Sequence, residues 1–142
     1  MSEIVRAADT FAYDPEMTEE QGEAIWMVDR TVVAVDSGGQ VLGTANMYAN
    51  RPGPGSHVAS GSLMVHPEHW GKGIGRTLCE EALDWARRQG YRGMQFNAVA
   101  ATNTRAIALY ESLGFELIGT VPGAFLHPTE GYVGLGVTYR AV

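Results

Sequence analysis

Three glycines at alternate positions, Gly71, Gly73 and Gly75, stand between a strand-like segment and a strongly helical pattern. Glycines leave the backbone without side-chain cover, so its amide groups can approach a ligand closely. The first N–H groups of the helix that follows have no partner within that helix, and together with the helix dipole they favour a negative charge. The spacing therefore indicates an anion site, suited to a phosphate.

Three other interpretations of the glycines compete with this one. A run of Gly-x-Gly-x-Gly also occurs in ordinary structural turns. A dinucleotide-binding loop requires a further glycine where this chain has Arg76, and an acidic residue at the end of the next strand. A nucleoside-triphosphate loop requires Gly-Lys followed by Ser or Thr, whereas Lys72 is followed by Gly73. The two nucleotide loops do not match, so the neighbouring elements have to decide between a turn and a phosphate site.

Composition limits the class of protein that could carry such a site. The 142 residues, 45% of them hydrophobic, predict a single domain over residues 1–142. Ten Lys and Arg against sixteen Asp and Glu leave a net charge of −6, which argues against a nucleic-acid partner. The lone cysteine cannot form an internal disulfide, and no signal peptide or long apolar run is present. We therefore expect a cytoplasmic protein that does not enter a membrane.

The segment before the glycines predicts mainly strands. Residues 3–8 could start a strand, and Thr18 with Gln21 matches a capping box before a helix over about residues 19–28. The run TVVAVD, the turn SGGQ and the run VLGTANMY predict a hairpin. After the loop RPGPGS, the run HVASGSLMV predicts a third strand that leads into the glycines.

The segment after the glycines begins with a helix whose apolar residues, Leu78 to Ala86, fall near one side before Gly90 ends it. A strand over residues 94–100 follows, so strand, helix and strand form a β-α-β unit with parallel strands. Thr102 or Asn103 caps a second helix. The runs ELIGTV and YVGLGVTYR then predict two closing strands joined by a long loop, PGAFLHPTEG.

Set in this order, LMVHPEHWGKGIGR resembles the central motif of the GNAT superfamily of acyl-CoA-dependent N-acetyltransferases. NTRAIALYESLGFELIGT is similar to the second motif of that family, and the resemblance covers roughly residues 41–140. It implies a mixed α+β fold, with a mostly antiparallel central sheet, a parallel β-α-β cofactor unit and flanking helices. It also implies an acyltransferase that uses acetyl-CoA. One departure is Trp70, which stands where the family has Arg or Gln.

The resemblance implies cofactor contacts on a strand end, a loop and a helix. The strand end binds the pantetheine arm, and the loop binds the diphosphate mainly through backbone N–H groups. The implied residues are Leu63, Met64 and Val65 on the strand, Trp70, Gly71, Lys72, Gly73, Ile74, Gly75 and Arg76 in the loop, and Asn103, Ala106 and Tyr110 on the helix. Tyr110 would stand near the thioester sulfur and donate a proton to the thiolate, although a buried aromatic on a helix also has a purely structural interpretation.

The acceptor side of the site is predicted from a closer resemblance. SHVASGSLMV and FNAVAATN look like the subgroup that includes fungal acetyltransferases of proline analogues, in which two Asn residues hold a small amino acid. Asn97 matches one of them and Ser60 replaces the other. The candidate substrate residues are Ser60, Asn97, Tyr48 and His127, with Asn46 on a neighbouring element. Some family members have a Glu base where this chain has Ala59, so we expect water-mediated deprotonation of the amine.

The remaining expectations concern metals, partners and alternatives. His66 and His69 lack the spacing and the Cys partners of a metal site, so we expect no metal. Cys79 falls on the apolar side of its helix, which favours direct transfer to a small-molecule amine in a ternary complex over an acyl-enzyme. The family often pairs through its C-terminal strands, which implies a homodimer. The alternatives are a non-catalytic acyl-CoA sensor, suggested by Ala59 and Trp70, and a nicotinamide-dependent reductase.

Overall fold

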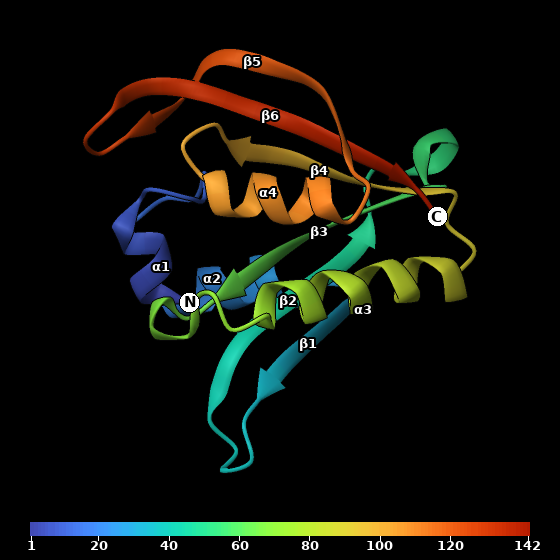
Figure 1. The fold of residues 1–142 in the computed structure, drawn as a ribbon, viewed down its shortest axis with the longest axis horizontal. Helices are drawn as coiled ribbons and strands as arrows, with labels where there is room; N and C mark the ends of the chain where they lie inside the picture. Colours follow the sequence, from blue (N-terminus) through green and yellow to red (C-terminus); the bar gives the residue numbers. More distant parts are fainter. The chain divides into compact units, whose positions relative to one another are not determined.

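A computed structural model describes residues 1–142, apart from the side chain of residue 2. The chain begins with two helices and a pair of strands and ends with a second pair of strands (Figure 1). The helices and strands are α1 (Ser2–Ala7), α2 (Glu19–Trp26), β1 (Arg30–Val35), β2 (Val41–Ala49), η1 (Gly53–Gly55), β3 (Val58–Val65), η2 (Pro67–His69), α3 (Ile74–Arg88), β4 (Gly93–Ala100), α4 (Thr104–Ser112), β5 (Glu116–His127) and β6 (Gly131–Ala141).

The six strands form one mixed sheet in the order β1-β2-β3-β4-β6-β5. β3 and β4 pair in parallel, whereas β1–β2, β2–β3 and β5–β6 pair antiparallel. The predicted hairpin, the parallel β-α-β unit and the mixed α+β class are therefore confirmed. Among the described residues, no helix combines the length and apolar character that a membrane crossing requires.

The chain packs as two compact units, which are described separately. Unit 1 consists of residues 1–22 and 95–140, and unit 2 consists of residues 23–94 and 141–142. Unit 2 therefore holds the glycine loop, and unit 1 holds α4 and the closing strands.

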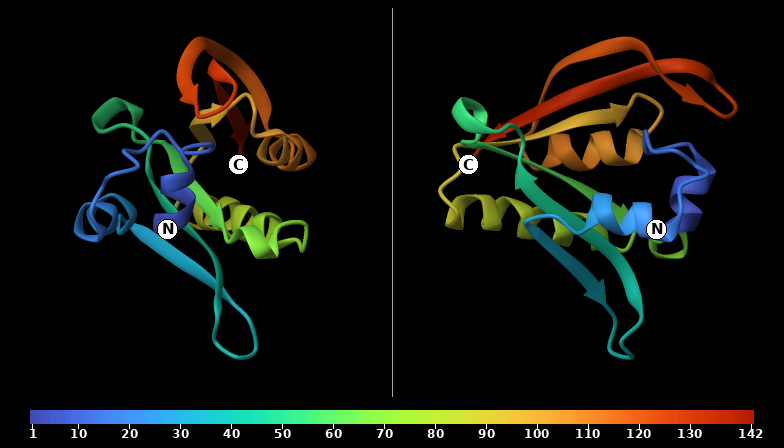
Figure 2. Two further views of the ribbon diagram at one scale, coloured as in Figure 1. Left: turned by 90° about the vertical axis from the view of Figure 1, so that its left-hand side faces the viewer. Right: turned by 180° about the vertical axis from the view of Figure 1, so that it is seen from behind.

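In unit 2, α3 covers one face of β2 and β3 (Figures 1 and 2). The apolar stripe expected on this helix is buried, and its members are Leu78, Cys79, Ala82, Leu83, Trp85 and Ala86. Close packing requires a small residue at Gly43 on β2, since a Cβ there would lie 2.8 Å from Met64 O on β3, 3.1 Å from Leu78 Cδ1 and 3.2 Å from Ile74 Cγ2 on α3. The N-terminus of α3 is thereby fixed against the sheet.

Trp26, at the end of α2, is bound to the polar residues of β1 and β2. Its indole Nε1 donates to Thr44 Oγ1 at 3.0 Å, and its carbonyl oxygen accepts from Thr31 Oγ1 at 3.0 Å and from Asn46 Nδ2 at 3.3 Å. Asn46 Oδ1 accepts from the backbone N–H of Ser62 at 2.8 Å. The nitrogen and the oxygen of this buried side-chain amide are therefore both bonded. The bond to Ser62 links β2 to β3, and the bond to Trp26 links β2 to the end of α2.

Two predictions concern the N-terminal segment: a strand over residues 3–8 and a capping box at Thr18 and Gln21. The strand predicted over residues 3–8 is wrong, because α1 occupies Ser2–Ala7. Glu3 in its first turn and Arg6 in its last turn complement the helix dipole, and Ala8 ends it with a φ of 53°. The predicted capping box is confirmed: Thr18 N–H donates to Gln21 Oε1 at 2.9 Å, and Gln21 N–H to Thr18 Oγ1 at 3.2 Å.

In unit 1, α4 packs against β4 through an aromatic cluster, and β5 and β6 form a long antiparallel pair (Figure 1). The long loop predicted between the closing strands is wrong, because β5 continues to His127. The register shifts between Val121 and Phe125, and this irregularity accommodates Pro122 and Gly123, whose φ is 61°. Only residues 128–130 separate β5 from β6.

The first prediction concerns Gly61 on β3. A Cβ at this position would overlap the backbone carbonyl oxygen of Asn46, which cannot rotate away. Gly61→Ala should therefore lower the free energy of unfolding by about 2 kcal/mol and the Tm by several degrees. The matched control is Gly134→Ala on β6, whose added methyl overlaps the side-chain Cγ2 of Thr120, a group that can rotate, and lies at ordinary contact distance from Val121 O and Ala101 Cβ. Equal Tm losses for the two variants would contradict this account of the β2–β3 contact.

Candidate active site

The chain between β3 and α3 forms a tight loop built on two left-handed glycines. Gly71 has a φ of 76° and Gly73 has a φ of 82°, a region that side chains rarely adopt. A Cβ at either glycine would have no heavy atom within 4 Å, so the backbone faces open space. Gly75 differs, because it lies in the first turn of α3.

Gly73 is the N-cap of α3, and its carbonyl accepts from the N–H and the hydroxyl of Thr77, each at 3.1 Å. The N–H groups of Ile74, Gly75 and Arg76 have no carbonyl within the helix to bind. They sit at the positive end of a 15-residue helix dipole. Open space, uncovered backbone and a helix N-terminus together fit a diphosphate group.

Trp70 links the glycine loop to the end of β3. Its indole Nε1 donates to the backbone carbonyl of Val65 at 3.0 Å, and its backbone N–H donates to Pro67 at 3.2 Å. The residue as a whole remains 40% exposed. The tryptophan therefore holds the end of β3 at a set distance from the first glycine, and it occupies one lone pair of a carbonyl that was expected to bind pantetheine.

The second prediction follows from this bond. Trp70→Phe removes the indole N–H and keeps an aromatic ring, so the KM for acetyl-CoA should rise about fivefold with kcat unchanged. The matched control is Trp26→Phe, which removes another 3.0 Å indole bond at a place away from the loop. Trp26→Phe should lower the Tm and leave KM unchanged. Identical KM values for wild type and Trp70→Phe would show that the bond does not shape the loop.

In unit 1, the start of α4 carries the second group of predicted cofactor residues. Asn103 is the N-cap, and its Oδ1 accepts from the backbone N–H of Ala106 at 3.2 Å. The amide nitrogen of Asn103 then remains for a ligand, whereas a contact from Ala106 has to come from its methyl group.

Tyr110 lies near the end of α4 and is 8% exposed. Its ring stacks on Phe96 with centroids 4.5 Å apart, and it meets Phe115 at 5.6 Å. Its carbonyl oxygen accepts from the N–H of Phe115 at 3.0 Å. This aromatic cluster fixes the ring, so it serves the packing of the helix and also holds the phenol in one orientation.

The predicted acceptor residues of unit 2 share one face of β2 and β3. Tyr48 and Ser60 are directly opposite each other in the antiparallel register, and Asn46 is opposite Ser62. Side chains two residues apart point to the same face, so all four lie together. Asn46, 2% exposed and bonded at both ends, is a structural residue of this face. Ser60 is also buried, at 1% exposed, and Tyr48 is only half-buried.

Two further acceptor candidates lie in unit 1. Asn97 on β4 accepts at Oδ1 from Gln95 Nε2 at 2.9 Å, so the two side chains share a face. His127 ends β5, and its Nδ1 accepts from the backbone N–H groups of Thr129 and Glu130, each at 3.2 Å. Nδ1 is therefore engaged by the backbone, and a contact from the His127 ring to a substrate has to come from Nε2.

The histidines beside the glycine loop belong to its local structure. His66 Nδ1 accepts from the N–H of Glu68 at 3.3 Å, and His69 Nδ1 lies 3.3 Å from Lys72 Nζ. Among the described side chains, no group of three His, Cys, Asp or Glu residues is placed to hold a metal ion.

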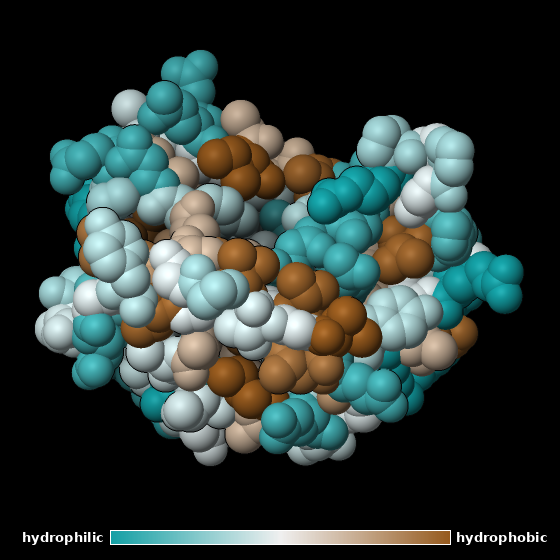
Figure 3. Space-filling view, turned by 90° about the horizontal axis from the view of Figure 1, so that it is seen from above, coloured by the Kyte–Doolittle hydropathy of each residue, from teal (hydrophilic) through white to brown (hydrophobic). Residues whose placement is uncertain are grey.

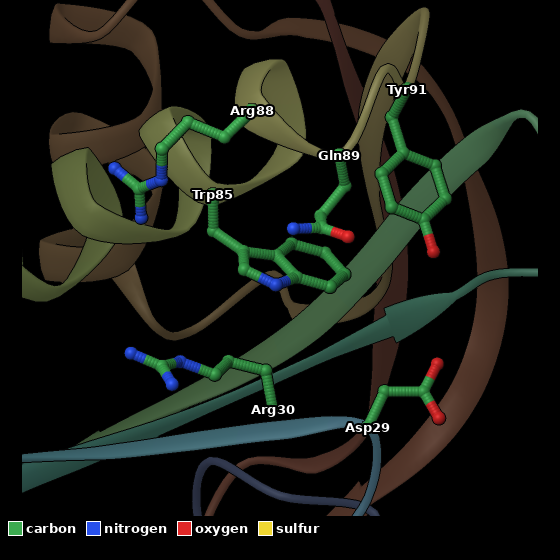
Figure 4. Close-up of a pocket in the computed structure, with 6 residues that line it drawn as sticks. All are labelled: Asp29, Arg30, Trp85, Arg88, Gln89 and Tyr91. Carbon is green, nitrogen blue, oxygen red and sulfur yellow. The ribbon is translucent and has the colours of Figure 1, made fainter.

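Sequence reasoning did not anticipate a pocket in unit 2, at the C-terminal end of α3 (Figure 4). Its volume is about 530 Å³, and Trp85 lies at its centre between the end of α3 and the residues that start β1. The ring of Tyr91 packs 5.1 Å from that of Trp85. Burial, followed by the charge of Asp29, raises the pKa of the Tyr91 phenol, so this residue stays neutral. The pocket is about 20 Å from the glycine loop along the helix.

Residues 1–115 match the sequence model of the Acetyltransferase (GNAT) family. The chain belongs to the GNAT family of acetyltransferases. A GCN5-related N-acetyltransferase from Kribbella flavida has a similar structure, with a TM-score of 0.96 and 58% identity over 99% of this chain and 87% of that one. The fold and the acyltransferase family expected from the two motifs are therefore confirmed.

Other relatives carry informative names. The protein yncA, a putative acetyltransferase from Salmonella typhimurium solved with its cofactor acetyl-CoA, has a TM-score of 0.82 and 25% identity over 99% of this chain and 85% of that one. N-acetyltransferase aca1 from Schizosaccharomyces pombe is 39% identical over 74% of this chain and 51% of its own length. L-methionine sulfoximine/L-methionine sulfone acetyltransferase from Salmonella typhimurium is 33% identical over 70% of this chain and 58% of its own length. The chain spans about half the length of these two curated relatives.

Proposed function

We propose that the chain is a single catalytic domain that transfers an acetyl group from acetyl-CoA to the amine of a small, amino acid-like molecule. The observation that carries the proposal is the loop at Gly71 and Gly73, where uncovered backbone opens onto the N-terminus of α3. The similarity to yncA, which was solved with acetyl-CoA, supports the same cofactor for this chain. The similarity to the L-methionine sulfoximine/L-methionine sulfone acetyltransferase supports an amino acid-like acceptor.

The residues of the chain then have distinct tasks. Backbone N–H groups from Gly71 to Arg76 bind the diphosphate, and the strand end at Leu63 to Val65 binds the pantetheine arm. Acetyl-CoA supplies the activated acyl carbon as a thioester. A backbone N–H of β3 stabilises the oxyanion that forms when the amine attacks that carbon. Tyr110 donates a proton to the sulfur that leaves, and water takes the proton from the amine.

The acceptor amine is assigned to the polar face of β2 and β3. In unit 2, the half-buried Tyr48 offers its hydroxyl group to a small amino acid, and Ser60, which lies opposite it in the register and is 1% exposed, is the second candidate. In unit 1, the candidates are Asn97 and His127. His127 can contribute only through Nε2. These tasks follow from the family resemblance and from the side chains described above.

We further propose that the protein acts as a cytoplasmic homodimer. Apolar side chains gather on the face over β5 and β6 (Figure 3). The exposed members on these strands are Leu117, Ile118, Val121, Leu126 and Tyr132. Exposed apolar side chains that gather on one face are typical of an interaction surface, and a second copy of the chain would cover them. Sedimentation of the wild type and of Ile118→Asp tests this: dissociation of the variant supports the dimer, and a monomeric wild type contradicts it.

A ligand-binding experiment tests the proposed function. Acetyl-CoA and free CoA should each raise the Tm of the protein, because a ligand that binds only the native state stabilises it by several kcal/mol at about a thousand times its Kd. A panel of amino acids added with free CoA should give a second increase for the acceptor class. Stabilisation by a nicotinamide cofactor and none by CoA would contradict the proposal.

A further inference from the structure

The pocket at the C-terminal end of α3 lies wholly within unit 2, and none of its residues takes part in the acetyl transfer proposed above (Figure 4). Small-molecule sites in proteins typically have volumes of about 300–1,000 Å³. The volume of this pocket, about 530 Å³, therefore suits a metabolite. Its wall consists of Asp29 and Arg30, where β1 begins, and of Trp85, Arg88, Gln89 and Tyr91, where α3 ends.

The pocket presents two opposite charges that do not pair with each other. The side chains of Asp29 and Arg30 point in opposite directions from adjacent backbone positions (Figure 4). Both residues are exposed, and within the part of the chain that the structure describes neither one forms a salt bridge. Arg88 differs, because its guanidinium already binds Glu81 at 2.9 Å. A bound cation would therefore meet Asp29, and a bound carboxylate would meet Arg30.

An apolar strip lies between the two charges. Trp85 lines the pocket and is 8% exposed, and its packing on Tyr91, with ring centroids 5.1 Å apart, fixes the indole. Figure 4 shows the indole between the side chains of Gln89 and Arg30. The methylene groups of a ligand would contact this strip, and the Gln89 amide offers both a donor and an acceptor.

We propose that this pocket binds a small zwitterion whose ammonium and carboxylate groups stand at opposite ends of a short aliphatic chain, as in an ω-amino acid. Such a ligand reaches Asp29 with one end and Arg30 with the other, while its chain covers the exposed strip of Trp85. An α-amino acid carries both groups on one carbon, so it does not span two side chains that diverge. The inference goes beyond the proposed function and does not rest on it, because the cofactor and the acceptor are assigned to other residues.

Titration with 6-aminohexanoate, followed by nuclear magnetic resonance of the indole N–H groups, tests the site. The chain has three tryptophans, and each reports on a different place. Trp26 Nε1 is bonded to Thr44 on β2, and Trp70 Nε1 is bonded to Val65 beside the glycine loop. Loss of one signal in Trp26→Phe and of another in Trp70→Phe assigns those two, which leaves the third to Trp85. Only the Trp85 signal should shift, and the shift should saturate.

Three related compounds test the specificity. 2-Aminohexanoate is an isomer of 6-aminohexanoate with both charged groups at one end, hexanoate lacks the ammonium group, and hexylamine lacks the carboxylate. Each should bind about fivefold more weakly than 6-aminohexanoate, because each forgoes about one exposed ion pair.

Two variants assign the two ends of the ligand. Arg30→Gln should weaken 6-aminohexanoate about fivefold and leave hexylamine unchanged, and Asp29→Asn should weaken 6-aminohexanoate by the same factor and leave hexanoate unchanged. The matched control is Arg87→Gln, which removes a positive charge from the last turn of α3. Arg87 binds Asp84 at 2.7 Å and is not among the residues that line the pocket, so no Kd should change.

The outcomes decide the inference as follows. A saturable shift of the Trp85 signal that depends on Arg30, on Asp29 and on the separation of the ligand charges supports the site. No saturable shift, equal Kd values for the four compounds, or wild-type affinity in either pocket variant would overturn it. A shift confined to the Trp26 or Trp70 signal would also overturn it, because the ligand would then bind elsewhere. The titration contains no CoA, so neither result changes the outcome of the acetyl-CoA experiment that tests the proposed function.

Discussion

Replacement of Tyr110 by Phe is expected to lower kcat about a hundredfold, the usual contribution of a positioned general acid. The variant keeps the ring that stacks on Phe96 and Phe115, so helix α4 and the Tm should be unaffected. The KM for acetyl-CoA should change little, because the lost interaction belongs to the leaving sulfur in the transition state. Steady-state release of free thiol in the presence of an acceptor amine measures both constants.

The matched control for Tyr110→Phe is Tyr91→Phe. Tyr91 also packs an aromatic ring against a neighbour, Trp85, but it lies at the other end of α3 from the glycine loop. Its phenol can be removed without touching the proposed chemistry, so kcat should stay at the wild-type value. If Tyr110→Phe turned over as fast as Tyr91→Phe, the residue would be part of the aromatic cluster and nothing more.

The second large effect is expected at the N-cap of α3. Gly73→Val should raise the Kd of CoA about a hundredfold, because a β-branched residue at a φ of 82° is strained by 1–3 kcal/mol and relaxes by moving the loop amides. Calorimetric titration with free CoA measures the change directly and does not depend on turnover.

Gly39→Val provides the control for backbone strain. Gly39 lies in the turn between β1 and β2 with a φ of 83°, and a Cβ there would also have no heavy atom within 4 Å. The two substitutions should therefore destabilise the fold by similar amounts, whereas only Gly73→Val should weaken CoA binding. A Gly73→Val protein that is folded and binds CoA within threefold of wild type would remove the loop from the cofactor site.

The sequence predicted those elements whose signals are local. Strings of β-branched residues around SGGQ specify the β1–β2 hairpin, and an apolar stripe between Gly73 and Gly90 specifies α3. Two elements were mispredicted for a related reason. Residues 3–8 contain too few residues for periodicity to separate helix from strand, and Pro122 with Gly123 resembles a loop although it forms an irregularity within β5.

The candidate site was predicted as a set of residues, and the structure adds how they are held. Equal spacing made the three glycines appear equivalent, yet only Gly71 and Gly73 have a positive φ. Trp70 appeared to be a loss of side-chain charge, and its bond to Val65 gives it a task in shaping the loop. The amide of Asn46 is bonded at both ends by groups at positions 26 and 62. Such contacts depend on three-dimensional packing, which no spacing rule contains.

The central claim is acetyl transfer to a small amine, and product analysis tests it most directly. Purified protein is incubated with acetyl-CoA and a panel of amino acids and simple amines, and the mixture is examined by mass spectrometry while free thiol is followed. The account predicts an N-acetylated product for at least one amino acid-like amine, with one thiol released for each product molecule. Tight binding of acetyl-CoA with no acetylated product from any amine would contradict the account and indicate an acyl-CoA sensor.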